Sequence, residues 1–141
     1  MDRPDLADAA LRYLYIGSRD TEADLAFHLA LGGRLIWRFQ RFGADVAAVR
    51  RGDGPALLLA DHRPPGGVLP IWAVPDLDAV MTTLRARGLE LGEVAETPDG
   101  PVLVLRSPSG AEIGVLGELR PGALEGAYRD PGERHAVRSR G

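Results

Sequence analysis

The spacing of hydrophobic and polar residues predicts alternating strands and helices. Leu77, Val80, Met81 and Leu84 recur at i, i+3, i+4 and i+7, the pattern of a helix with one apolar side. Residues 11–17 are aromatic and β-branched, which favours a strand. In chain order we expect strands at 11–17, 34–42, 44–51 and 55–61, then at 68–74, 89–96, 101–107 and 111–117, with helices at about 21–31 and between Asp76 and Gly88.

A 56-residue offset lays the first half of the chain on the second half. The matched residues stand where backbone geometry is demanding, at helix starts, helix ends and turns. They are Asp20 with Asp76, Gly32 with Gly88, Leu35 with Leu91, Val46 with Val102, Arg50 with Arg106 and Gly54 with Gly110. A repeat of this length is one supersecondary unit used twice. The predicted fold is therefore α+β, built from two β-α-β-β-β units that share a core.

The expected boundaries follow from this repeat. The first unit covers residues 11–62 and the second covers 68–118, joined by the Pro- and Gly-rich link 63–67. Residues 1–10 form an N-terminal arm. Residues 119–141 mix Pro, Gly and charge with little to bury, so we expect a weakly ordered tail.

Composition narrows the function classes. The chain has 141 residues and a net charge of −3, which argues against a general nucleic-acid binder and against a polybasic membrane patch. It has no cysteine, so disulfides, thiolate metal sites and a cysteine nucleophile are excluded. We find no secretory signal and no apolar run of membrane-spanning length, and we expect a cytoplasmic protein that acts on a small molecule.

Charge differs between the two copies. Residues 33–51 hold five arginines against one aspartate, for +4, while residues 89–107 hold one arginine against four acidic residues, for −3. The basic edge would favour an anionic or oxygen-rich ligand, or the opposite edges would attract each other across a homodimer. Solvated surface charge is the default explanation.

Several motifs give the chain a resemblance to a known superfamily. They are Arg19-Asp20 through Leu25-Ala26-Phe27-His28 to Leu31-Gly32-Gly33, Gly52-Asp53-Gly54-Pro55 with Leu57-Leu58-Leu59, Val74-Pro75-Asp76-Leu77-Asp78, and Ser107 to Val115. With the doubled unit they resemble the vicinal oxygen chelate superfamily of glyoxalases, extradiol dioxygenases, fosfomycin-modifying enzymes and bleomycin-resistance proteins. The resemblance covers residues 11–118. It implies mixed sheets that curl into an open barrel, helices outside, a ligand pocket inside and, in many relatives, a homodimer.

The resemblance also implies a divalent metal, held by a histidine in the first strand of a unit and a glutamate in the last. The corresponding positions here are Tyr13 and Leu69 in the first strands, and Leu58 and Gly114 in the last strands. Leucine and glycine side chains cannot coordinate a metal, and tyrosine does so only as a phenolate. We therefore expect the family's metal site to be missing and no metal cofactor to be bound.

Candidate ligand-binding residues follow from strand alternation. Tyr13 and Tyr15 lie on the face that carries the ligands in the family, although they could instead fill the barrel. Trp37 and Phe39 share a face that would stack on a planar ligand, or fill the core, or form a dimer contact. His62 and Glu112 could reach the pocket, and with Glu118 they would form an improvised metal or acid–base set, although solvated residues are the simpler interpretation.

Two other residues are assigned to packing. His28 stands where Leu84 stands in the second helix, and Trp72 matches Ile16, so both are expected to pack between helix and sheet.

The favoured function is a small-molecule binding protein that sequesters an aromatic metabolite or antibiotic. The alternatives are a lyase, isomerase or dioxygenase-like enzyme with a relocated metal or metal-free acid–base chemistry, and an interaction protein. No catalytic residue is assigned.

Overall fold

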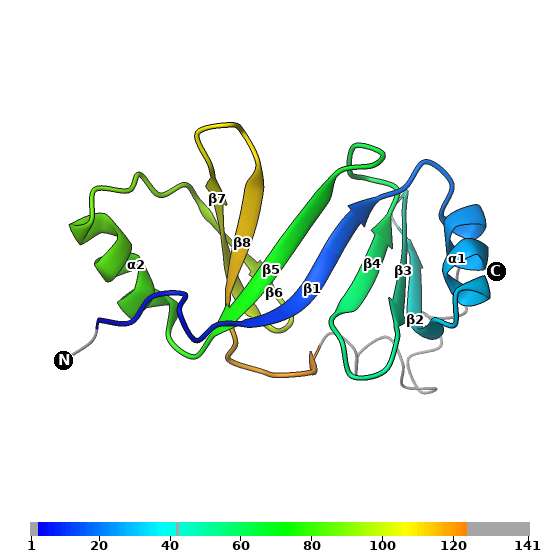
Figure 1. Ribbon diagram of the computed structural model, residues 1–141, viewed down its shortest axis with the longest axis horizontal. Helices are drawn as coiled ribbons and strands as arrows, with labels where there is room; N and C mark the ends of the chain where they lie inside the picture. Colours follow the sequence, from blue (N-terminus) through cyan, green and yellow to red (C-terminus); the bar gives the residue numbers. More distant parts are fainter. Residues whose placement is uncertain (1–2, 42, 124–141) are drawn as a thin grey trace. The chain divides into compact units, whose positions relative to one another are not determined.

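The chain folds as two compact units with the same order of elements (Figure 1). The structure is a computed structural model, and it describes residues 3–41 and 43–123. The first unit comprises residues 13–69, and the second comprises the N-terminal residues up to Arg12 together with 70–123. The predicted tail therefore lies outside the described residues from residue 124 onward. No helix of the described part is long and apolar enough to cross a membrane.

The first unit is a mixed four-stranded sheet with one helix. Its elements are β1 (Ala10–Gly17), α1 (Thr21–Ala30), β2 (Arg34–Arg41), β3 (Ala44–Arg50) and β4 (Ala56–Ala60). The first three residues of β1 belong to the second unit. The strand order is β2-β3-β4-β1, in which β1 runs parallel to β4 and the other pairs are antiparallel.

The second unit repeats this arrangement. Its elements are β5 (Val68–Val74), α2 (Leu77–Ala86), β6 (Val94–Thr97), β7 (Gly100–Arg106) and β8 (Glu112–Gly117). The strand order is β5-β8-β7-β6, and β5 runs parallel to β8. The α+β class and the doubled β-α-β-β-β unit are thus confirmed.

The 56-residue offset holds at the level of single residues. It carries the bounds of α1 onto those of α2 and the bounds of β3 onto those of β7. The strand register is also kept, because Val46 faces Ala60 in the first unit and Val102 faces Leu116 in the second. Both helices begin at an aspartate whose carboxylate accepts a backbone N–H 3.1 Å away, Asp20 from Ala23 and Asp76 from Ala79.

The copies differ in their second strand. We predicted a strand over 89–96, but β6 begins only at Val94, so the prediction was wrong for residues 89–93. In the first copy Ile36 and Trp37 are buried and anchor β2, which bulges between Leu35 and Trp37. Gly92 and Glu93 occupy those positions in the second copy, and neither residue type favours a strand.

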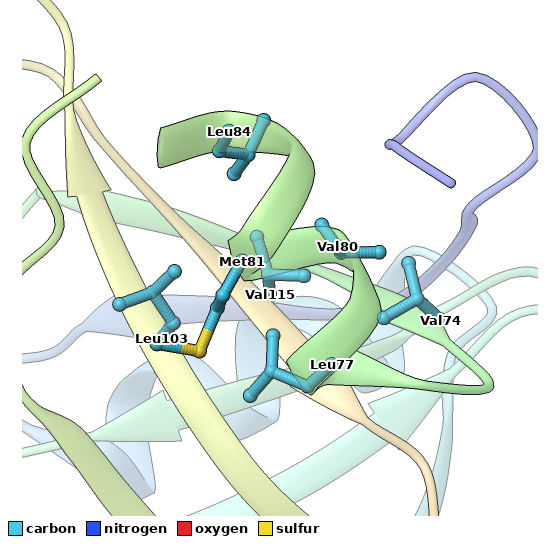
Figure 2. Packing of buried hydrophobic residues seen from close by; sticks show 7 residues of the cluster. All are labelled: Val74, Leu77, Val80, Met81, Leu84, Leu103 and Val115. Carbon is cyan, nitrogen blue, oxygen red and sulfur yellow. The ribbon is translucent and has the colours of Figure 1, made fainter. Parts of the chain in front are cut away.

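Each helix packs on its own sheet. The predicted apolar stripe of α2 is buried against Leu103, Val115 and Val74, and Figure 2 shows these side chains gathered between helix and strands. The N-terminal arm joins this cluster through Leu6 and Ala9. In the first unit the cluster is smaller and consists of Leu25, Ala47, Val49 and Leu59, with Ile16 packed against it.

Candidate functional site

The first unit has an apolar hollow of about 160 Å³. It lies on the face of the sheet opposite α1, because strand residues alternate between faces and the intervening residues belong to the cluster beneath α1. The hollow is lined by Tyr15, Trp37, Phe39, Ala44, Val46, Leu58 and His62. Four strands and His62, which follows β4, therefore contribute to one concave surface.

The strand register explains why these side chains meet. Tyr15 of β1 faces Leu58 of β4 in the parallel pair, and Phe39 of β2 faces Val46 of β3 in the antiparallel pair. The bulge in β2 keeps Trp37 on the face of Phe39 but turns Leu35 toward the helix side, where it pairs with Val49. Trp37 is only 4% exposed, so it forms a buried wall of the hollow.

Polar groups stand at one side of this apolar surface. The Tyr15 hydroxyl lies 3.4 Å from Nε2 of His62, and the two rings meet edge to face with centroids 5.8 Å apart. The guanidinium carbon of Arg63 lies 5.7 Å from the centroid of the Tyr15 ring. This side of the hollow therefore carries a hydroxyl, an imidazole and a cation beside an otherwise apolar surface.

Ion pairs fix the β2–β3 hairpin that carries one wall. Arg38 donates two hydrogen bonds to the Asp45 carboxylate, at 3.0 and 2.8 Å, and one to Glu22 of α1 at 2.6 Å. These bonds raise the pKa of Arg38 further above its usual value. The Asp45 N–H also donates to the Asp61 carboxylate at 2.9 Å. Asp45 thus ties the strand that bears Ala44 and Val46 to α1, through Arg38, and to Asp61, the residue after β4.

Four of the six predicted ligand-binding residues line this hollow, namely Tyr15, Trp37, Phe39 and His62. Tyr13 does not line it; this residue is buried two positions earlier in β1, opposite Ala56. Glu112 lies in the second unit and forms an ion pair with Arg106. Sequence reasoning missed Ala44, Val46 and Arg63, and the register of the β2–β3 hairpin is the signal that would have found the first two.

The improvised set of His62, Glu112 and Glu118 gains no support. Glu118 accepts two hydrogen bonds from Arg12, at 2.7 and 2.9 Å, and its side chain is mostly buried. Both glutamates are thus neutralised by arginines of their own unit. Within residues 3–41 and 43–123, no group of three His, Cys, Asp or Glu side chains could hold a metal ion.

The second unit has a different surface at the equivalent place. The 56-residue offset replaces Tyr15 by Ile71, Phe39 by Ala95 and Leu58 by Gly114. A hollow of about 530 Å³ in this unit is lined instead by Glu90, Gly92, Glu93, Val104, Arg106 and Glu112. Only Glu93 of this second hollow matches a residue of the first, namely Trp37, so the aromatic lining is a property of the first copy.

Comparison with known proteins places the fold. No protein-family model matches the chain, and no curated protein matches its sequence. A hypothetical protein from Bacillus halodurans C-125 is similar with a TM-score of 0.65 at 15% identity, over 77% of this chain and 94% of that one. A glyoxalase/bleomycin resistance protein/dioxygenase superfamily member from Vibrio splendidus 12B01 gives 0.54 at 15% identity, over 76% and 96%.

A catechol 2,3-dioxygenase gives a TM-score of 0.60 at 17% identity, over 80% of this chain and 42% of that one. The chain thus spans less than half of that enzyme, but nearly the whole of the Bacillus and Vibrio proteins. These likenesses show that the chain has the fold of the vicinal oxygen chelate superfamily.

The resemblance assigns metal ligands to the positions of Tyr13, Leu58, Leu69 and Gly114, none of which is a histidine or a carboxylate. In the first unit Leu58 lines the hollow, and the residue facing it across the strands is Tyr15. In the second unit Gly114 faces Ile71, and a side chain added at Gly114 would meet Ile71 Cγ1 at 3.2 Å. Divalent metals in this kind of site require imidazole or carboxylate donors. These strand pairs supply one phenol and otherwise hydrocarbon.

Proposed function

We propose that the chain is a small-molecule binding protein, that its ligand occupies the hollow of the first unit, and that the metal positions of the fold are vacant. The observation that carries the proposal is the lining itself, with aromatic and aliphatic walls and a polar pair at one side. Binding sites for small organic molecules commonly combine a mostly apolar concave surface with a few convergent polar groups.

The dimensions favour a ligand portion of about one ring. An engineered apolar cavity of about 150 Å³ in another protein binds benzene, and the hollow here is about 160 Å³. Trp37 and Phe39 supply faces and edges for contact with an aromatic ring. The Tyr15 hydroxyl and His62 would hydrogen-bond an oxygen substituent at the rim. We therefore propose an aromatic metabolite or antibiotic with a hydroxyl or carboxylate group.

The first test is ligand-induced stabilisation by phenol, benzoate and cyclohexanol, each measured as a rise in Tm. A ligand at a hundredfold excess over its Kd adds about 2.7 kcal/mol to the free energy of unfolding. We expect phenol or benzoate to stabilise the protein more than cyclohexanol does. Ala44→Leu should fill the hollow and abolish the ligand-induced rise in Tm, and it removes no buried side-chain volume. Trp37→Ala should weaken binding about tenfold or more.

The matched control is Trp72→Phe, which alters the other tryptophan. Trp72 lies in the second unit and pairs with Val115, a residue of the cluster beneath α2. Binding in this variant should equal that of the wild type. The proposal fails if none of the three compounds raises Tm, or if binding survives both Ala44→Leu and Trp37→Ala.

The vacant metal positions have their own test. Protein purified without chelator or affinity metal should contain no stoichiometric metal, and manganese, iron, nickel and zinc, added singly, should leave Tm unchanged. A bound metal with a clear rise in Tm would refute this part of the proposal. The enzyme alternative, with a relocated metal, would then become the better interpretation.

The contact between Tyr15 and His62 favours a second candidate, an enzyme that works by general acid–base catalysis. Histidine and tyrosine are residue types that transfer protons to and from bound substrates, and here they adjoin a hollow of ligand size. A lyase or isomerase reaction would fit this pair. His62→Ala should then abolish turnover while phenol or benzoate still binds; for a binding protein, the same variant changes affinity alone.

A further inference from the structure

Arginines border the hollow of the first unit on two sides. On one side Arg63 lies against Tyr15, with its guanidinium carbon 5.7 Å from the ring centroid, and His62 meets the Tyr15 hydroxyl at 3.4 Å. On the other side stands Arg41, which faces Ala44 across the β2–β3 pair. Ala44 lines the hollow, and directly paired residues project to the same face of a sheet. Arg41 therefore adjoins the hollow at the hairpin end.

Acidic side chains do not share this surface. None of the described residues that line the hollow is an aspartate or a glutamate. Asp45 is the one acidic residue of β1 to β4, and its carboxylate accepts hydrogen bonds from Arg38 and Gln40 on the α1 side of the sheet. Asp61, which precedes His62, accepts the backbone N–H of Asp45. The described groups that a ligand in the hollow would face are therefore neutral or basic.

The second copy shows that the repeated backbone does not require these basic residues. The 56-residue offset replaces Arg41 by Thr97, His62 by Glu118 and Arg63 by Leu119. The same order of elements and the same strand register form with these residues in place. The basic border accompanies the aromatic lining of the first copy, which links both features to what the hollow binds.

The link that carries Arg63 is fixed against the end of β1. The Gly17 N–H donates to the Gly67 carbonyl at 2.9 Å, and the Gly66 N–H donates to the Gly17 carbonyl at 3.1 Å. The carbonyl oxygen of Pro64 also packs closely on Gly17. The backbone at Arg63 is thus held in place before a ligand arrives, so less conformational freedom is lost on binding.

We infer that the hollow binds the anion of an aromatic acid, with the ring against Trp37 and Phe39 and the carboxylate at Arg63 and the Tyr15 hydroxyl. This inference rests on the proposed function and adds to it the charge of the ligand. A guanidinium presents its N–H donors in a planar arrangement that matches both oxygens of a carboxylate. Arg41 adds positive potential from the opposite side.

The test compares benzoate, benzamide and benzamidine, which share one ring and carry a negative, no and a positive charge. Titration calorimetry gives the Kd of each compound. We expect benzoate to bind at least about tenfold more tightly than benzamide, equivalent to about 1.4 kcal/mol, and benzamidine to bind most weakly. Added salt should weaken the binding of benzoate and leave that of benzamide unchanged.

Arg63→Gln and Arg41→Gln should each lower the preference for benzoate over benzamide about threefold or more, with the Kd of benzamide close to that of the wild type. Arg63→Lys keeps the charge and should retain more of the preference than Arg63→Gln. Arg85→Gln is the matched control, because Arg85 is exposed on α2 of the second unit. This variant should bind all three compounds like the wild type.

Equal affinities for benzoate and benzamide would overturn the inference but leave the proposed function standing, because the hollow would then bind the ring without regard to charge. The inference is also overturned if both Arg63→Gln and Arg41→Gln keep the full preference, or if Arg85→Gln loses it equally. If neither benzoate nor benzamide binds, the proposed function fails and the inference fails with it.

Discussion

Replacing His28 by leucine should stabilise the protein. The imidazole Nδ1 of His28 is buried and has no hydrogen-bond partner among residues 3–41 and 43–123. The equivalent residue in α2 is Leu84, which is 5% exposed and packs in the α2 cluster. An unsatisfied buried polar group costs about 1–3 kcal/mol. The helix propensity of leucine is also more favourable than that of histidine by a few tenths of a kcal/mol. We expect His28→Leu to raise the free energy of unfolding by about 1–2 kcal/mol.

The pH dependence gives this prediction a sign. Burial lowers the pKa of His28 below 6.5, the charge of Arg51 lowers it further, and Asp24 partly opposes both. As the pH falls through about 6.5, the unfolded chain therefore binds a proton that the folded chain does not. Stability contributed by neutral His28 is present above this pH and is lost toward the lower folded-state pKa. His28→Leu should remove that loss.

The assay is urea unfolding at about pH 7.5 and about pH 5.5, where the difference between wild type and variant should widen on the acid side. Leu84→His is the reciprocal control and should cost about 2–4 kcal/mol, because it places a polar ring in a filled cluster. The reasoning is refuted if His28→Leu lowers stability by more than about 1 kcal/mol, since His28 would then have a partner. It is also refuted if the loss of stability on the acid side is unchanged.

Two further predictions concern backbone positions. A Cβ added at Gly17 would lie 1.8 Å from the carbonyl oxygen of Pro64, so Gly17→Ala should cost more than about 3 kcal/mol in urea unfolding. At Gly43, by contrast, φ is 76° and an added Cβ would have no neighbour within 4 Å, so Gly43→Ala should cost only about 1–2 kcal/mol. Equal costs for the two variants would show that the predicted clash at Gly17 does not occur. Asp20→Ala and Asp76→Ala should each lower the free energy of unfolding by about 1 kcal/mol, because each removes a helix cap. A variant with unchanged stability would show that its aspartate cap does not contribute.

Sequence could predict the elements because their ends depend on local chemistry. Both helices are marked by local features alone. At the start, an aspartate accepts the backbone N–H of the residue three positions later, and after the end stands a glycine with φ of 95° or 87°. The apolar stripe of α2 was equally local. The prediction of a strand at 89–93 was wrong because a repeated unit keeps a strand only where its side chains still stabilise it. Gly92 and Glu93 replace the two buried residues that anchor β2.

The candidate site could be predicted only in part. Strand alternation shows which face of the sheet a side chain lies on, but not where along that face the hollow lies. Tyr13 and Tyr15 have the same parity, and the pairing of Tyr15 with Leu58 decides which of them adjoins the hollow. Glu112 had the right parity as well, but it lies directly across the β7–β8 pair from Arg106, which binds its carboxylate. Parity cannot reveal such a cross-strand partner unless the register is known.

The two copies have kept one backbone and diverged on its inner face. Leu58 in the first unit becomes Gly114 in the second, where Ile71 Cγ1 and Val102 Cγ1 approach within 3.2 and 3.4 Å of the place a Cβ would take. The neighbouring side chains thus close over the space that the first copy leaves open beside Tyr15. A comparison of folds uses backbone positions and therefore does not detect this change of side chains. If the proposed function is right, ligand binding should respond to substitutions that line the hollow of the first unit and tolerate those at the matching positions of the second.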